Sequence, residues 1–295
     1  MNRVKQILKT EYAYRRGYFG EGIGVAIMDT GIAEHPDFGH RIVEFRDYIT
    51  YQKKIYDDNG HGSHVAGIIA GSGKMSQGLY SGIAPACHLV AMKVLDKKGN
   101  GNTESLIESI EWMVEHQVEY NVRIMNISVG MVLSARNEER GRLLRAVEYA
   151  WDSGIVVVAA AGNNGPANGT VTIPGICRKI ITVGCFDDDA EELREQGLKP
   201  DYSGRGPTES CIIKPELVEP GTNIISCTNN KKYYTSKSGT SMSAPIVSGA
   251  IALLLSKYPD FSPKDVKIRL YERAVDLGLP IHKQGWGMVD ISKLL

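Results

Sequence analysis

The sequence has few cysteines, no long apolar run and no excess of either charge. Its five cysteines, at positions 87, 177, 185, 211 and 227, form no CxxC pair, and an odd number cannot all pair within one chain. We therefore expect free thiols in a reducing compartment rather than a disulfide framework. The longest apolar runs, such as IVVVAAA (155–161) and AIALLL (250–255), are too short to span a bilayer.

The N-terminal residues 1–16, MNRVKQILKTEYAYRR, lack the apolar core of a secretory signal, although a chain trimmed of its leader would look the same. Together with the thiols they predict a cytoplasmic location. The 34 lysines and arginines equal the 34 aspartates and glutamates in number. This balance gives no electrostatic reason to expect nucleic acid or a membrane as a partner. The 42% apolar content is enough to bury a large core, which argues against disorder.

Short apolar runs rich in β-branched residues alternate with helical patterns. Because the runs are continuous rather than alternating, they predict strands buried on both faces, as in a parallel sheet covered by helices. We therefore predict an α/β fold, doubly wound, with a mostly parallel sheet and helices on both faces, in one domain spanning 1–295. Residues 1–20 form an N-terminal segment that is either regulatory or trimmed. Strands are expected at 23–28, 88–95, 122–128, 155–161 and 179–184, and helices at 61–71, 103–117 and 139–154.

Two more helices are expected towards the C-terminus. Residues 240–258 are apolar on nearly all sides, which predicts a buried central helix. Ser262 and Pro263 read as an N-cap and a first helical residue, opening an amphipathic helix that ends near Ala274. The charged stretch 186–207 is interpreted as a surface excursion.

Two segments place a reactive side chain where the backbone changes element. MDTG (28–31) ends the first strand with Asp29, and sites in open α/β sheets form at the carboxyl ends of strands. Alone, this motif also fits an ordinary turn. HGSHVAG (61–67) opens a helix with His61 in its first turn, and we interpret His64, one turn later, as structural. A zinc site on the two histidines is disfavoured because no third ligand lies at a suitable spacing, so no metal is predicted.

GTSMSAP (239–245) is the most specific of the segments. It places Ser241 at a helix N-terminus, where the helix dipole favours developing negative charge. A serine hydroxyl needs a histidine base, which is held in one tautomer by a buried carboxylate. Asp29, His61 and Ser241 supply these three groups. The alternative, that Ser241 only caps the helix, leaves the other two segments unexplained.

AAAGNNG (159–165) follows an apolar strand and offers an amide side chain at its end. There Asn163 could donate a hydrogen bond to a tetrahedral oxyanion beside the backbone N–H of Ser241. The simpler interpretation, asparagine and glycine as turn formers, fits Asn164 and Gly165 better.

In these segments and their order Asp, His, Ser, the chain resembles the subtilisin-like (subtilase) serine proteases over roughly residues 15–290. The resemblance implies a serine endopeptidase that acts on polypeptides through an acyl-enzyme. Ser241 would attack, His61 would carry the proton, Asp29 would orient His61, and Asn163 would bind the oxyanion. No assembly state is predicted.

The resemblance also implies a substrate groove. Its expected edge strand, which pairs with substrate backbone, is Ser128, Val129 and Gly130. Ala160, Ala161 and Gly162 would form one wall of the pocket for the residue before the scissile bond, and Thr172 its floor. Without an acidic residue there, the pocket is expected to be uncharged. A second pocket would be lined by Thr103 and Leu106.

The chain departs from secreted subtilisins in the loop GSGKMSQGLYSG (71–82), which offers no carboxylate. Because calcium usually takes several carboxylates, we expect no required cofactor, while a weak calcium site elsewhere stays open. Serine at position 63 replaces a common threonine. With no long pro-domain before the core, the chain looks most like the intracellular serine proteases of Gram-positive bacteria. The alternatives are a catalytically silent subtilase that binds peptides, which usually lacks a triad member, and a processing peptidase for one precursor.

Overall fold

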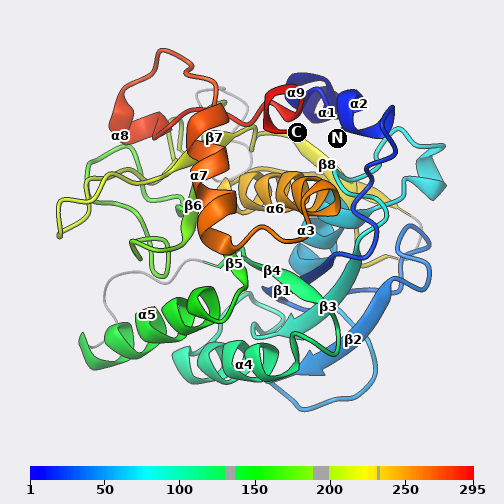
Figure 1. The fold of residues 1–295 in the computed structure, drawn as a ribbon. Helices are drawn as coiled ribbons and strands as arrows, with labels where there is room; N and C mark the ends of the chain where they lie inside the picture. Colours follow the sequence, from blue (N-terminus) through cyan, green and yellow to red (C-terminus); the bar gives the residue numbers. More distant parts are fainter. Residues whose placement is uncertain (130–136, 189–198, 231–232) are drawn as a thin grey trace.

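We analysed a computed structural model of the chain, which describes residues 1–129, 137–188, 199–230 and 233–295 (Figure 1). Its centre is a seven-stranded sheet in the order β2-β3-β1-β4-β5-β6-β7, and every neighbouring pair is parallel. The strands are β1 (Gly24–Asp29), β2 (Ile42–Asp47), β3 (His88–Lys93), β4 (Val122–Ile127), β5 (Val156–Ala160), β6 (Ile181–Cys185) and β7 (Leu217–Glu219). A separate antiparallel hairpin joins β8 (Ile224–Cys227) to β9 (Tyr234–Lys237).

Helices cover both faces of the sheet (Figure 1). Helices α3 (His61–Ala70) and α6 (Thr240–Lys257) pack together on one face, and α4 (Thr103–His116) and α5 (Asn137–Asp152) pack together on the other. The predicted α/β fold with a parallel sheet is therefore confirmed. The remaining described helices are α1 (Asn2–Leu8), α2 (Glu11–Tyr14), the 3-10 turn η1 (Lys74–Ser76), α7 (Pro263–Arg273), α8 (Ile281–Gln284) and α9 (Ile291–Leu294).

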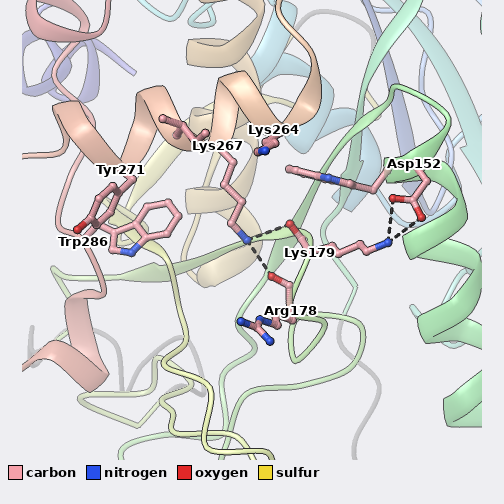
Figure 2. A pocket seen from close by; sticks show the side chains of 9 residues that line it. Asp152, Arg178, Lys179, Lys264, Lys267, Tyr271 and Trp286 are labelled. Atoms are coloured by element: carbon pink, nitrogen blue, oxygen red, sulfur yellow. Dashed lines mark hydrogen bonds and ion pairs between the residues drawn. The ribbon is translucent and has the colours of Figure 1, made fainter.

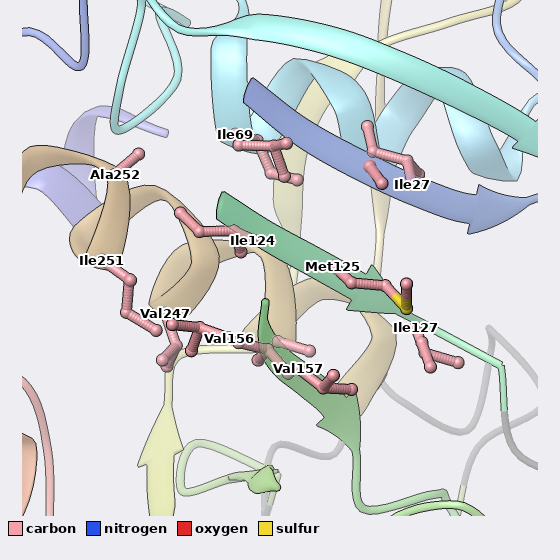
Figure 3. Close-up of a cluster of buried hydrophobic side chains, with 14 of the residues drawn as sticks. Ile27, Ile69, Ile124, Met125, Ile127, Val156, Val157, Val247, Ile251 and Ala252 are labelled. Carbon is pink, nitrogen blue, oxygen red and sulfur yellow. The ribbon is translucent and has the colours of Figure 1, made fainter. Parts of the chain in front are cut away.

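The core lies between the sheet and its helices. Every residue of β1, β5 and β6 is buried, as the continuous apolar runs predicted. Figure 3 shows Ile124 of β4 and Val156 of β5 facing Val247 and Ile251 of α6. These four side chains are almost fully buried and fill the space between the sheet and α6.

Helix α6 runs through the middle of the molecule. Among the described helices it alone is long and apolar enough to cross a membrane, but 83% of that stretch is buried inside the protein. Its side chains contact strands β1, β4, β5, β6 and β7. A helix that is apolar all round needs such an environment, so the expected central helix is present.

Helix α7 begins as expected from its sequence. Ser262 accepts from the backbone of Asp265, whose carboxylate accepts in return from the Ser262 backbone, and Pro263 occupies the first turn. This capping box satisfies two backbone groups at the helix start. The helix ends at Arg273, one residue before the predicted end.

The stretch 186–207 is not wholly a surface excursion, which corrects our interpretation. Residues 189–198 lie outside the described residues, but Asp188 before them and residues 202–206 after them are buried. Asp188 and Ser203 are fully buried and Tyr202 is 1% exposed. The Ser203 backbone N–H donates to the Asp188 carboxylate over 2.9 Å. The charged residues of this stretch suggested that it lies on the surface, but its two ends are buried and hydrogen-bonded to each other.

Candidate active site

Asp29 is the last residue of the central strand β1, and its side chain is fully buried. One carboxylate oxygen accepts from the backbone N–H of Thr30 over 2.7 Å. Nδ1 of His61 lies 2.7 Å from one oxygen of the same carboxylate and 2.9 Å from the other. The structure therefore brings together the first two predicted residues.

His61 begins helix α3, directly after Gly60, which takes a left-handed φ of 95°. The start of α3 lies so close to the Asp-Thr-Gly turn that a Cβ on Gly62 would come within 2.1 Å of the Gly31 carbonyl oxygen. Only glycine permits this approach. The glycine after the histidine therefore sets the short distance between His61 and Asp29.

The His61 imidazole is a quarter exposed, so a substrate can reach it. Burial alone would lower its pKa, but the Asp29 carboxylate raises it more, and the resulting pKa lies above the ordinary 6.5. Because Nδ1 donates to the carboxylate, Nε2 is the nitrogen that can accept a proton.

Asp57, which the sequence analysis did not single out, fixes the start of α3. One carboxylate oxygen accepts from the Thr30 hydroxyl and from the backbone of Gly60, and the other accepts from the backbone and hydroxyl of Ser63. Burial alone would raise the pKa of Asp57, but these hydrogen bonds lower it below its ordinary value. Asp57 therefore joins the turn after Asp29 to the helix that carries His61.

Ser241 lies in the first turn of α6, after Gly239, whose φ of 144° suits only glycine. Its hydroxyl donates over 2.9 Å to the backbone carbonyl of Ser128. Among the described residues, no hydrogen bond joins this hydroxyl to His61. Rotation about one side-chain bond frees the hydroxyl, and catalytic hydrogen bonds are often unmade before substrate binds.

Ser128 and Asp29 lie next to each other at one edge of the sheet. Strands β1 and β4 are neighbours in which Met28 pairs with Ile127, so the next residues, Asp29 at the end of β1 and Ser128 just after β4, lie side by side. Adjacent strands lie about 4.8 Å apart. Since His61 is hydrogen-bonded to Asp29 and Ser241 to Ser128, the four residues gather at the carboxyl edge of the sheet, where we expected Asp29.

Asn163 follows strand β5 at the same edge and is exposed. Its side-chain oxygen accepts from both the backbone N–H and the hydroxyl of Thr240, each over 3.0 Å. The amide nitrogen of Asn163 lies next to Gly239: a Cβ added to this glycine would be 3.2 Å from that nitrogen. With the oxygen engaged, the free group of the amide is a hydrogen-bond donor beside the start of α6. Thr240 was also missed from sequence, because its role depends on a contact between distant segments.

The predicted pocket residues also meet. The backbone N–H of Thr172 donates to the Ala161 carbonyl over 2.9 Å, and a Cβ on Gly162 would lie 2.5 Å from the Thr172 methyl group. Ala160 is buried at the end of β5. Ala160, Ala161 and Gly162 thus form one wall, and Thr172 packs against it. None of them can ionise.

A second hollow, of about 190 Å³, lies beyond the end of β4. Leu106 and Val129 both line it, as does Asn102, the N-cap of α4. Thr103 is buried at the start of α4 and is not part of this lining. Gly130, the third predicted edge residue, lies outside the described residues.

His64 has the structural surroundings that we expected. Its ring is fully buried, and Nε2 donates to the carbonyl of Ile224 in β8 over 2.9 Å. Burial lowers its pKa to about 3, so it stays neutral at neutral pH. It ties α3 to the hairpin.

The loop 71–82 does not fit calcium. The carboxylate beside it belongs to Asp37, whose oxygens accept from the backbone of Gly73 and Met75 and from the Tyr234 hydroxyl. Calcium takes six to eight oxygen ligands, whereas this loop presents N–H donors. Asp37, His35 and Cys227 form the one cluster of potential metal ligands among the described residues. There His35 Nδ1 accepts from the backbone N–H of Asp37 over 3.2 Å, so that nitrogen is not free to bind a metal.

Comparisons with known proteins agree with this geometry. The sequence profile of the Subtilase family matches residues 20–287. Subtilisin DY of Bacillus licheniformis is 34% identical over 97% of this chain and 95% of its own length. The solved structure of Sphericase has a TM-score of 0.79 at 31% identity, covering 92% of each chain. The chain therefore belongs to the subtilase family, and its class is that of the subtilisin-like serine-type endopeptidases.

A further relative is longer than this chain. Serine protease AprX of Bacillus subtilis (strain 168) is 41% identical in an alignment of 265 positions that covers 84% of this chain and 60% of AprX. The chain thus spans well under two thirds of that relative. The resemblance named from the motifs is confirmed.

Proposed function

We propose that the protein cleaves peptide bonds through Ser241, His61 and Asp29. The Ser241 oxygen attacks the carbonyl carbon of the substrate while His61 Nε2 takes the hydroxyl proton. His61 then gives that proton to the leaving amine, and water hydrolyses the acyl-enzyme by the reverse proton transfers. Asp29 orients the imidazole and stabilises its charged form. The observation that carries this proposal is the hydrogen bond between His61 and the buried Asp29, beside the residue after β4 to which the Ser241 hydroxyl donates.

The oxyanion of the tetrahedral intermediate is assigned to two donors, the side-chain amide of Asn163 and the backbone N–H of Ser241. Thr240 supports this role because it engages the Asn163 oxygen and leaves the nitrogen to donate. The N-terminus of α6 adds a favourable dipole at the same place. Donors held in position before the reaction stabilise developing charge without reorganisation.

Polypeptides are the proposed substrates. The segment after β4, from Ser128, is assigned to pair with substrate backbone, and the wall at Ala160, Ala161 and Gly162 with Thr172 is assigned to the residue before the scissile bond. Because that wall carries no charge, we expect a preference for uncharged side chains there. The hollow beside Leu106 and Val129 suits an apolar side chain further along the peptide.

A library of internally quenched peptides tests this function. The wild-type protein should cleave peptides with an uncharged residue before the scissile bond, and Ser241→Ala should lose turnover while keeping its circular dichroism spectrum. Turnover by Ser241→Ala equal to that of the wild type would refute the assigned nucleophile. Running the library with and without a chelator tests the further proposal that catalysis needs no metal. A cytoplasmic location stays a prediction.

A further inference from the structure

One hollow of the described surface lies away from the candidate active site, at the opposite edge of the sheet. It occupies about 620 Å³ and is bordered by the end of α5, the segment before β6, and α7 (Figure 2). Trp151 and Asp152 precede β5, and Arg178 and Lys179 precede β6, so they lie at the amino ends of these strands. The candidate catalytic residues follow the carboxyl ends. A ligand in this groove would therefore leave the catalytic edge free.

One face of α7 forms a side of the groove. Lys264, Lys267, Ile268 and Tyr271 line it at the spacing of residues on one helix face. The opposite face carries the buried Val266 and Leu270. Ile268 is 44% exposed and Tyr271 is 61% exposed, so this face presents apolar and aromatic surface to solvent.

The centre of the groove is a fixed cation between two aromatic rings. Lys267 Nζ donates over 2.9 Å to the carbonyls of Arg178 and Lys179 (Figure 2). The Ile180 carbonyl and the Glu216 carboxylate also lie 2.9 Å from this atom as acceptors. The same atom lies 5.8 Å from the Trp151 ring and 5.9 Å from the Trp286 ring. Because these bonds use its three protons, Lys267 contributes positive charge and a rigid floor rather than a contact for a ligand.

Two other cations remain for a ligand. The side chains of Arg178 and Lys264 are exposed and have no hydrogen bond or ion pair among the described residues. Lys179, by contrast, pairs with Asp152 over 2.7 Å. The lining thus holds four cations and one carboxylate, although the chain as a whole carries no net charge.

We propose that this groove binds an acidic peptide segment of a partner protein, with an apolar or aromatic side chain against Trp151, Trp286 and Tyr271 and carboxylates at Arg178 and Lys264. Tryptophan, tyrosine and arginine are the residues that most often dominate binding at protein interfaces. The Tyr271 and Trp286 rings already form an edge-to-face pair at 5.3 Å, which keeps them in place. Two free cations suit a short acidic segment better than a nucleic acid, whose binding rests on many phosphate contacts.

The test uses the full chain as Ser241→Ala, so that a bound peptide survives. The probe is an acetylated, amidated pentapeptide with two acidic residues on each side of one phenylalanine. Two of the three tryptophans, Trp151 and Trp286, line the groove, so a change of fluorescence reports binding. We expect saturable binding that is roughly tenfold tighter than that of the same peptide with glutamines for acids.

Variants locate the site. Arg178→Glu with Lys264→Glu should weaken binding of the acidic peptide at least roughly tenfold, because both changes reverse a contact charge. Tyr271→Ala, at an exposed position, should weaken it as well. Lys53→Glu, an exposed lysine outside this groove, is the matched control and should leave the affinity unchanged.

Three results would overturn the proposal. The first is equal affinity for the acidic and the glutamine peptides. The second is equal weakening by Lys53→Glu and by the groove variants. The third is tighter binding of a single-stranded oligonucleotide of the same charge, which would assign the surface to nucleic acid. None depends on whether Ser241 is the nucleophile, so the result stands apart from the proposed catalytic function.

Discussion

The imidazole of His61 donates from Nδ1 to the carboxylate of Asp29, 2.7 Å from the nearer oxygen. One residue ends a strand and the other begins a helix, and the close approach of Gly62 to Gly31 holds these two elements together. The contact fixes the tautomer and the orientation of the ring, and it raises the pKa of His61. Each of these three effects has a measurable consequence.

The pH dependence of activity tests the effect on the pKa. His61 acts as a base only when neutral, so kcat/KM should rise with pH through a pKa that lies above the ordinary 6.5. Asp29→Asn removes the charge that raises this pKa, so the midpoint should move to lower pH. The rate at neutral pH should fall roughly 10⁴-fold, because asparagine also favours the wrong tautomer. A full pH profile of both proteins measures this, and an unmoved midpoint would contradict the assignment.

Asn163 and Thr240 should act as a unit. Asn163→Ala should lower kcat roughly 10²- to 10³-fold with little change in KM, the size known for an oxyanion donor of subtilisin. Thr240→Val removes the hydroxyl that holds the Asn163 oxygen and should lower kcat by a smaller factor. Steady-state kinetics on a peptide substrate give both values.

The double variant separates orientation from a general packing effect. If Thr240 acts by orienting Asn163, then Thr240→Val should have little effect on kcat in an Asn163→Ala background. Equal effects of Thr240→Val in both backgrounds would show that the threonine acts in another way.

Asp57 should be important for stability. Asp57→Asn replaces one carboxylate oxygen by an amide nitrogen, which cannot accept. Either the two donors of Ser63 or those of Gly60 and Thr30 then lose their acceptor. The loss should lower the free energy of unfolding by roughly 3 kcal/mol. Because the folded pKa of Asp57 lies below the ordinary 3.8, its stabilisation is complete above that pH and lost as the pH falls through the folded pKa.

Denaturant unfolding at several pH values measures this contribution. The difference between wild type and Asp57→Asn should be large at neutral pH and shrink in strong acid. Asp276→Asn is a control, since this exposed carboxylate also accepts a backbone hydrogen bond, and it should cost much less. An equal loss in both variants would contradict the role given to Asp57.

Asp37 should stabilise the loop 71–82 without an ion. Asp37→Asn breaks bonds from Gly73, Met75 or Tyr234 and should lower the melting temperature by the same amount in calcium and in a chelator. Thermal unfolding in both buffers decides this. A loss that occurs only in calcium would show that the carboxylate binds the ion.

The five strands inside the sheet could be predicted from the sequence, because each is a continuous apolar run. Strand β7, at one edge of the sheet, is buried as well but was missed because it has only three residues. Strand β2 could not be predicted, since it lies at the other edge of the sheet, where Glu44 and Arg46 interrupt the apolar pattern. The hairpin β8–β9 was missed because its strands have four residues each. Edge position and short length both weaken the periodic signal.

In the candidate site, too, some features could be predicted from the sequence and others could not. Asp29, His61, Ser241 and Asn163 could be predicted because each lies where a recognisable motif ends or begins an element. The hydrogen bond from Ser241 to Ser128, and the acceptor role of Asp57, could not. They depend on how segments distant in sequence approach each other, and no local pattern records that approach.

Covalent labelling with a fluorophosphonate, mapped by mass spectrometry, tests the central claim most directly. A hydroxyl activated by His61 should take one label, on Ser241, and both Ser241→Ala and His61→Ala should abolish or greatly slow the labelling while the folded spectrum is unchanged. Labelling that persists in Ser241→Ala, or a label on another residue of the wild type, would contradict the account.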